Sequence, residues 1–137
     1  MAYLIGVILA AATAVLAVFI GFERERAFYP TLLIVIATYY ILFAAMGAGG
    51  RTLIAESLVA TIFLVVAVLG YRKSAWIVAA ALCGHGIFDF FHHLLIANPG
   101  VPQWWPGFCL AFDVTLAVWV MARHSAARAD RNNSAAD

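Results

Sequence analysis

The sequence predicts an all-α, polytopic membrane protein, a bundle of about five transmembrane helices. Of its 137 residues, 66% are hydrophobic and only 11% are charged, whereas soluble domains are about half apolar and about a quarter charged. A water-soluble fold of this length could not bury so much apolar surface, so the lipid bilayer is the expected solvent. The apolar residues also gather in segments of the right length.

Five segments approach the roughly 20 apolar residues that a helix needs to cross a bilayer. They are residues 2–22, 30–47, 52–70, 75–97 and 105–122. Charged, glycine-rich or proline-rich stretches separate them, and the clearest turn chemistry lies at 98–102. Residues 1–123 therefore form one predicted transmembrane domain. The polar stretch 124–137 predicts a disordered cytoplasmic tail.

Two alternatives to this count remain open at the level of the sequence. The first segment has no Lys or Arg before it, which favours a retained helix over a cleaved signal peptide. One of the five segments could instead lie in the membrane interface and leave four spans. Five spans remain the prediction.

Basic residues predict the orientation. With five spans, one side of the membrane carries the first loop, the third loop and the tail, with the residues Arg24, Arg26, Arg72, Lys73, Arg123, Arg128 and Arg131. The other side carries Arg51 alone. Because cytoplasmic loops are enriched in Lys and Arg, the N-terminus is expected outside and the C-terminus in the cytoplasm.

The stretch 83–93 is unusual for a membrane span because it holds three of the four histidines. Ionisable groups inside a bilayer are costly and usually serve a function or a specific partner. Residues at i, i+4 and i+7 share a helix face, and His85, Asp89 and His92 have that spacing. His93 lies four residues beyond Asp89, so Asp89 can reach either member of the histidine pair.

Depth in the membrane adds further candidates, at about 1.5 Å per residue from the outer end of each helix. Asp113 falls near the depth of Asp89, and so do Tyr39 and Tyr40. Glu56 falls near the depth of the histidine pair. If the outer helix ends are level, polar groups from four helices gather in the outer half of the bilayer.

Imidazole and carboxylate groups together suit a transition metal such as zinc, iron or copper. The candidate ligands are His85, Asp89, His92, His93, Glu56 and Asp113. Asp89 could also orient an imidazole from outside the ligand set. Haem is not favoured, because the remaining histidine, His124, lies at the opposite membrane face. A metal-free proton relay and a network of hydrogen bonds between helices stay open as alternatives.

Three motifs carry a resemblance to known sequences. They are GFERERAFYP at 21–30, GHGIFDFFHH at 84–93 and NPGVP at 98–102. The chain resembles, over nearly its whole length up to the tail, a family of short bacterial integral membrane proteins of unknown function. The resemblance implies a location in the bacterial inner (plasma) membrane. It implies no activity and assigns no residue a role.

Several function classes are disfavoured. The net charge of +1 gives no reason to expect nucleic acid as a partner, and P-loop, dinucleotide and nucleophile-elbow motifs are missing from the sequence. Three hypotheses remain: a site that binds a transition metal or small ligand, with oxidation or hydrolysis of a lipid-soluble substrate; an oligomeric proton-coupled transporter or channel; and an accessory subunit of a larger membrane complex. The sequence does not decide whether the protein is an enzyme.

Overall fold

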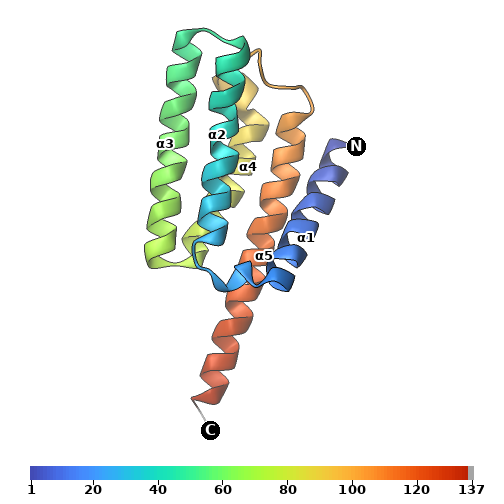
Figure 1. The fold of residues 1–137 in the computed structure, drawn as a ribbon, viewed down its shortest axis with the longest axis vertical. Coiled ribbons are helices and arrows are strands. Elements are labelled where there is room, and N and C mark those ends of the chain that lie inside the picture. Colours follow the sequence, from blue (N-terminus) through green and yellow to red (C-terminus); the bar gives the residue numbers. More distant parts are fainter. Residues whose placement is uncertain (136–137) are drawn as a thin grey trace.

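The computed structural model describes residues 1–135 and is built from helices (Figure 1). They are α1 (Ala2–Ile20), the short 3-10 helix η1 (Phe22–Arg24), α2 (Phe28–Gly47), α3 (Gly50–Lys73), α4 (Ala75–Leu95) and α5 (Trp105–Ser134). Five of them are long and apolar enough to cross a membrane, which confirms the predicted fold class.

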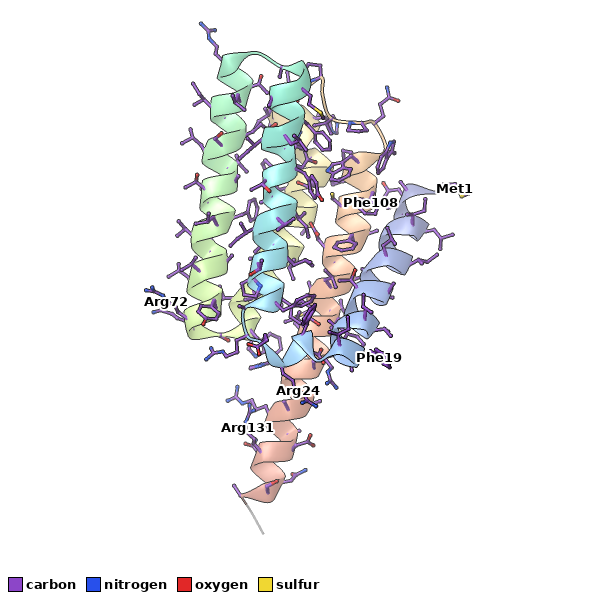
Figure 2. All side chains as sticks on the ribbon, in the orientation of Figure 1. Met1, Phe19, Arg24, Arg72, Phe108 and Arg131 are labelled. Atoms are coloured by element: carbon purple, nitrogen blue, oxygen red, sulfur yellow. The ribbon has the colours of Figure 1, made fainter. Side chains whose placement is uncertain are left out.

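The helices form a bundle whose two ends differ in chemistry (Figures 1 and 2). We call one the Met1 end; it holds the N-terminus, the turn between α2 and α3, and the segment 96–104. The opposite end, the Arg72 end, holds η1 and the turn between α3 and α4, and Arg24, Arg72 and Arg131 lie on that side. If all five helices span the membrane, the two termini lie on opposite faces.

From α2 to α5, helices that are adjacent in the sequence pack against each other, whereas α1 does not pack against α2. Helices α2, α3, α4 and α5 each pack against the next or the next but one, and α4 with α5 forms the largest contact. Within the described residues, α1 packs against α5 and η1 alone. It therefore lies outside the four-helix core, on the far side of α5 (Figure 1).

Small residues make the contact between α1 and α5 close. The residues of α1 that are buried are Gly6, Ala10, Ala14 and Ala17. A Cβ atom placed on Gly6 would lie 2.5 Å from the carbonyl oxygen of Phe108. Helices in lipid associate through such small residues, because large apolar side chains gain little by leaving lipid for protein.

Glu23 closes the Arg72 end. Its carboxylate accepts hydrogen bonds from the Trp119 indole at 2.8 Å and the Tyr29 hydroxyl at 3.3 Å, and it forms an ion pair with Arg123 at 2.8 Å. Gly21 ends α1 in the left-handed region at φ 92° and turns the chain toward this contact. The first loop is thus fixed to α5, about a hundred residues along the chain.

Helix α5 continues well past the end expected from hydropathy at residue 122. It runs to Ser134, and its last part extends beyond the bundle (Figure 1). Residues 125–134 are exposed. The part of the chain expected to be a disordered tail is helical up to Ser134, and its last two residues, 136 and 137, lie outside the described residues.

Candidate functional site

Five polar or charged residues are buried in the described structure. They are Glu56, His85, Asp89, His92 and Asp113. All come from the half of the bundle near the Met1 end: the start of α3, the second half of α4 and the first part of α5. Lipid offers such groups no hydrogen-bond partner, so each has to be satisfied by another protein group or by a ligand.

The first group comprises His85, Asp89 and Asp113. The Nδ1 of His85 lies 2.7 Å from the Oδ2 of Asp113 and 3.5 Å from the Oδ2 of Asp89. One potential ligand atom from each residue lies within 4.8 Å of the others, so the group could hold a metal ion. The side chains are 2%, 0% and 0% exposed, which excludes ordinary solvent as their partner.

Local sequence explains how this group forms. His85 and Asp89 are separated by one helical turn of α4 and therefore share a face. Gly86 lies between them, where a Cβ atom would be 3.0 Å from the Cβ of Asp113 and 3.2 Å from the Cα of Leu110. The missing side chain thus lets α5 approach and brings Asp113 to the imidazole.

Oxygen atoms of this group lack partners. Among the residues the structure describes, nothing donates a hydrogen bond to either oxygen of Asp89 or to the Oδ1 of Asp113. The Tyr40 hydroxyl and the Cys109 thiol lie next to Asp89, although neither makes a well-aligned hydrogen bond to it. Two buried carboxylates next to one imidazole therefore present an excess of acceptors, which is the condition a bound cation relieves.

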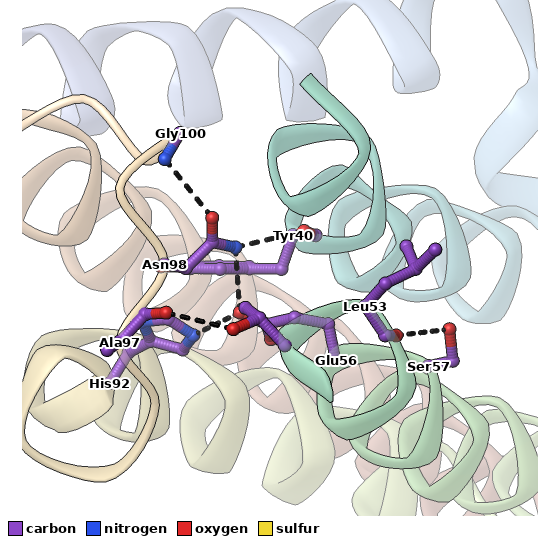
Figure 3. A network of polar contacts seen from close by, with 9 residues as sticks. Tyr40, Leu53, Glu56, Ser57, His92, Ala97, Asn98 and Gly100 are labelled. Carbon is purple, nitrogen blue, oxygen red and sulfur yellow. Dashed lines mark hydrogen bonds and ion pairs between the residues drawn. The ribbon is translucent and has the colours of Figure 1, made fainter. Parts of the chain in front are cut away.

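The second group joins α3, α4 and the segment 96–104 (Figure 3). The Nε2 of His92 lies 2.8 Å from the Oε1 of Glu56, and the Asn98 amide donates to the same oxygen at 2.8 Å. Asn98 also donates to the Tyr40 carbonyl oxygen at 3.2 Å and accepts from the Gly100 amide at 3.2 Å. These contacts close the Met1 end, and within the described residues they leave the Oε2 of Glu56 without a partner.

Tyr40 connects the two groups. Its ring packs against the His92 ring with centroids 4.2 Å apart, and its hydroxyl faces Asp89. Aromatic side chains enclose the imidazoles: Phe63 lies edge-on to His85 at 4.6 Å, and Phe88 lies edge-on to His92 at 5.7 Å.

The structure brings together five of the six candidate ligands, but in two groups. Asp89 and Asp113 meet, as do Glu56 and His92, which are the pairs placed at common depths by the sequence. His93 is exposed and belongs to neither group. A helix turns by about 100° per residue, so of the two adjacent histidines only one can face the core.

Tyr39 and Tyr40, which the sequence placed at a similar depth, lie on different faces of α2. Tyr40 is buried, whereas Tyr39 lies on the lipid-facing side and is 38% exposed. Two contributors were not foreseen. Asn98 was interpreted as part of a turn, and Cys109 fell in the fifth apolar segment without an assigned role; both cysteines are free in the structure. The Asn-Pro-Gly sequence at 98–100 offered a signal for Asn98, because Asn side chains in turns bond to nearby backbone.

The comparisons with known proteins give a family but no function. No curated protein and no solved structure matches the chain. The sequence does match one family over residues 1–126, which include every residue of both buried groups. The chain therefore belongs to the DUF6010 family, a family of unknown function.

Proposed function

We propose that His85, Asp89 and Asp113 bind a divalent transition metal inside the membrane, in the half of the bundle near the Met1 end. The observation that carries the proposal is the pair of fully buried carboxylates with three partnerless oxygen atoms around one imidazole. A residue set chosen only to hold helices together would pair these atoms with donors, as the second group pairs the Oε1 of Glu56 with His92 and Asn98. In that group one oxygen, the Oε2 of Glu56, lacks a partner, against three in the first group.

Charge supports a divalent ion. Two ionised carboxylates and a neutral imidazole carry a charge of about −2, which is very costly in a medium of low dielectric constant. A divalent cation cancels this charge and supplies a partner to one oxygen of each carboxylate. A single proton shared between the carboxylates would cancel only half of it.

Distances support a transition metal. Bonds of about 2.0–2.2 Å to nitrogen and oxygen, at a tetrahedral angle, put two ligand atoms roughly 3.4 Å apart. The 3.5 Å separation of His85 and Asp89 matches this value, and the 2.7 Å contact between His85 and Asp113 has to widen by about 0.7 Å to reach it. Imidazole with carboxylates suits zinc or iron, with copper less favoured because of the two oxygen ligands.

Three protein ligands leave a coordination position open, as in catalytic rather than structural metal sites. The Tyr40 hydroxyl and the Cys109 thiol face the Asp89 side of the group. We therefore infer metal-dependent chemistry, oxidation or hydrolysis, on a lipid-soluble substrate. The proposed setting is the bacterial inner membrane, with the site in its outer half.

A proton relay is the second candidate, and the chain of groups from Glu56 and His92 through Tyr40 to Asp89 favours it. The relay does not cross the bilayer within one described chain. Between the His85 group and the Arg72 end, the buried residues of α4 are Val78, Ala79, Ala81 and Leu82. A monomer therefore lacks a path for protons in that half, and a transporter would need an oligomer.

Metal content tests the proposal. The protein would be purified in mild detergent without chelators, and metals would be measured in wild type, Asp89→Asn, Asp113→Asn and the control His93→Gln. We expect a near-stoichiometric metal in wild type and His93→Gln, and at least about a tenfold loss in the two Asn variants, which each remove a ligand charge.

Cobalt provides an independent readout on the same samples. Co²⁺ added to metal-free wild type should give the visible absorption of a low-symmetry site, and the absorption should weaken as the pH falls, because protons compete for the ligands. Wild type that contains no metal and gives no Co²⁺ spectrum, although folded, would overturn the metal site and favour the proton relay.

A further inference from the structure

A cavity opens at the Met1 end of the bundle, beside the segment 96–104. Its volume is about 740 Å³, and its walls come from the end of α4, this segment, the start of α5 and the first turn of α1. The lining residues with polar side chains are Tyr3, His92, His93, Asn98 and Gln103. Because such side chains can contact water, the cavity offers a hydrated ion an entry that the lipid-facing surface does not.

The inner wall of the cavity belongs to the second buried group (Figure 3). His92 and Asn98 line the cavity, and each places a nitrogen atom 2.8 Å from the Oε1 of Glu56. Glu56 is 1% exposed, and its other oxygen, Oε2, has no partner among the described residues. A buried carboxylate oxygen without a donor thus lies one side chain away from the cavity, and a cation would satisfy it.

A polar stripe on α4 connects this wall to the first group. His85, Asp89 and His92 follow one another at intervals of four and three residues, so they share one face of the helix. Tyr40 covers the step from His92 to Asp89, because its ring lies 4.2 Å from the His92 ring and its hydroxyl lies next to Asp89. Groups that can bind a cation therefore follow one another from the cavity to the proposed metal group.

The other approaches to the first group are apolar. Toward the Arg72 end, the buried residues of α4 are Val78, Ala79, Ala81 and Leu82. Between α1, α2 and α5, a groove of about 480 Å³ reaches Cys109, and its described lining contains no charged side chain. A divalent cation that sheds its water needs ligands in exchange, because an uncompensated charge is very costly at low dielectric constant.

We propose that a hydrated divalent transition-metal ion enters through this cavity and is bound in transit by Glu56 and His92. The ion then passes to Asp89, so this inference rests on the proposed metal site. In transit, the Oε2 of Glu56 supplies an oxygen ligand, and the His92 Nε2 exchanges its bond to Oε1 for the metal. The 2.8 Å contact between the two residues widens to roughly 3.4 Å around the ion, while Asn98 continues to donate to Oε1.

The rate of Co²⁺ loading tests the transit site. Metal-free protein in nanodiscs would be mixed with Co²⁺, and both the rate and the final visible absorption would be recorded. Glu56→Gln keeps an oxygen acceptor for His92 and Asn98 but removes the charge, so it should slow loading by at least about tenfold and leave the final absorption unchanged. The control Glu25→Gln, at an exposed position of the Arg72 end, should load at the wild-type rate.

Blocking the cavity tests the entry independently of any ligand. In a background with Cys83→Ala and Cys109→Ala, Gln103→Cys would be loaded before and after reaction with a bulky fluorescein maleimide. The modification should slow loading by roughly tenfold, because Gln103 lines the cavity. The same modification of Ser125→Cys, on the extension of α5, should leave the rate unchanged. Each sample is compared with itself, so a change in folding caused by the substitutions does not affect the comparison.

The outcomes separate this inference from the metal proposal. Full final absorption reached at the wild-type rate in Glu56→Gln, or at an unchanged rate in modified Gln103→Cys, would overturn the route and leave the metal site standing. Loss of the final absorption in a folded Glu56→Gln would make Glu56 a ligand of the resident metal and overturn its transit role. Wild type that gives no Co²⁺ absorption at any time would remove the metal site and this route together.

Discussion

Asn98 holds three parts of the chain together with one side-chain amide. It donates to Glu56 on α3 and to the Tyr40 carbonyl oxygen on α2, and it accepts from the Gly100 amide. The Thr52 hydroxyl adds a contact from α3 to the Ala97 carbonyl oxygen at 3.1 Å. The segment 96–104 is therefore attached to the bundle through specific hydrogen bonds, and it covers the second buried group.

Replacing Asn98 with Ala should destabilise the protein by about 1–3 kcal/mol, because it leaves the buried Glu56 oxygen with His92 as its remaining partner. Asn98→Asp should cost more, since a second carboxylate would face Glu56. Thermal unfolding in detergent measures both. Gln103→Ala, at an exposed position of the same segment, serves as the control; an equal shift in the control would contradict the assigned role.

The sequence could indicate which buried side chains lie close together where their depth in the membrane decides the pairing. Helix geometry fixes the height of each residue in a span, so the pairs Asp89 with Asp113 and Glu56 with His92 could be proposed before the fold was known. The sequence could not choose between His92 and His93, because Asp89 has helical spacing to both. That choice depends on which face of α4 packs inward, which is a tertiary property.

At the level of elements, glycines at the α4–α5 interface set how closely the helices approach. Gly84 and Gly86 lie on the same helix two residues apart, yet only Gly86 meets α5; nothing described lies within 4 Å of a Cβ placed on Gly84. The two positions therefore form a natural matched pair, with the same residue type and the same helix context.

Gly86→Ala should destabilise the protein by about 1–3 kcal/mol, because the added methyl group forces α5 away from α4. It should also weaken Co²⁺ binding, since Asp113 moves with α5. Gly84→Ala should leave binding unchanged and stabilise the helix by up to about 1 kcal/mol. Thermal unfolding and Co²⁺ titration of both variants test this; a neutral Gly86→Ala would refute the close approach.

Hydropathy predicted the five helices and most of their ends to within a few residues, because exclusion of polar backbone from lipid dominates at that level. It could not predict which helices pack together. Lipid is as apolar as a leucine side chain, so an apolar helix face does not indicate which other helix it packs against. The contact of α1 with α5 depends instead on small residues such as Gly6 and Ala10.

The contact between Glu23 and α5 also could not be predicted from the sequence. In the sequence, the charged run at 23–26 indicated only a break between the first two apolar segments. In the structure, Glu23 pairs with Arg123, and Arg26 donates to the Tyr71 carbonyl oxygen at 3.1 Å. Both contacts join segments at least 45 residues apart, and spacing in a sequence carries no information about such pairs.

Over the whole molecule, charge and buried polarity lie at opposite ends. The buried ionisable groups lie in the half near the Met1 end. All basic residues except Arg51 belong to the Arg72 end or to the extension of α5 beyond it (Figure 2). The orientation of the protein therefore decides from which side of the membrane the proposed metal would reach the buried groups.

Cysteine accessibility tests the orientation. In a background with Cys83→Ala and Cys109→Ala, a membrane-impermeant maleimide applied to intact cells should label Gln103→Cys but not Ser125→Cys, and permeabilised cells should show both.

This result follows from the positive-inside rule, because the basic residues near the Arg72 end stay in the cytoplasm. Labelling of Ser125→Cys alone would reverse the orientation, and labelling of both would indicate dual insertion. Labelling of Gln103→Cys alone would mean that the metal proposed for His85 and Asp89 comes from the extracytoplasmic side, since the inner half of α4 presents a continuous apolar barrier.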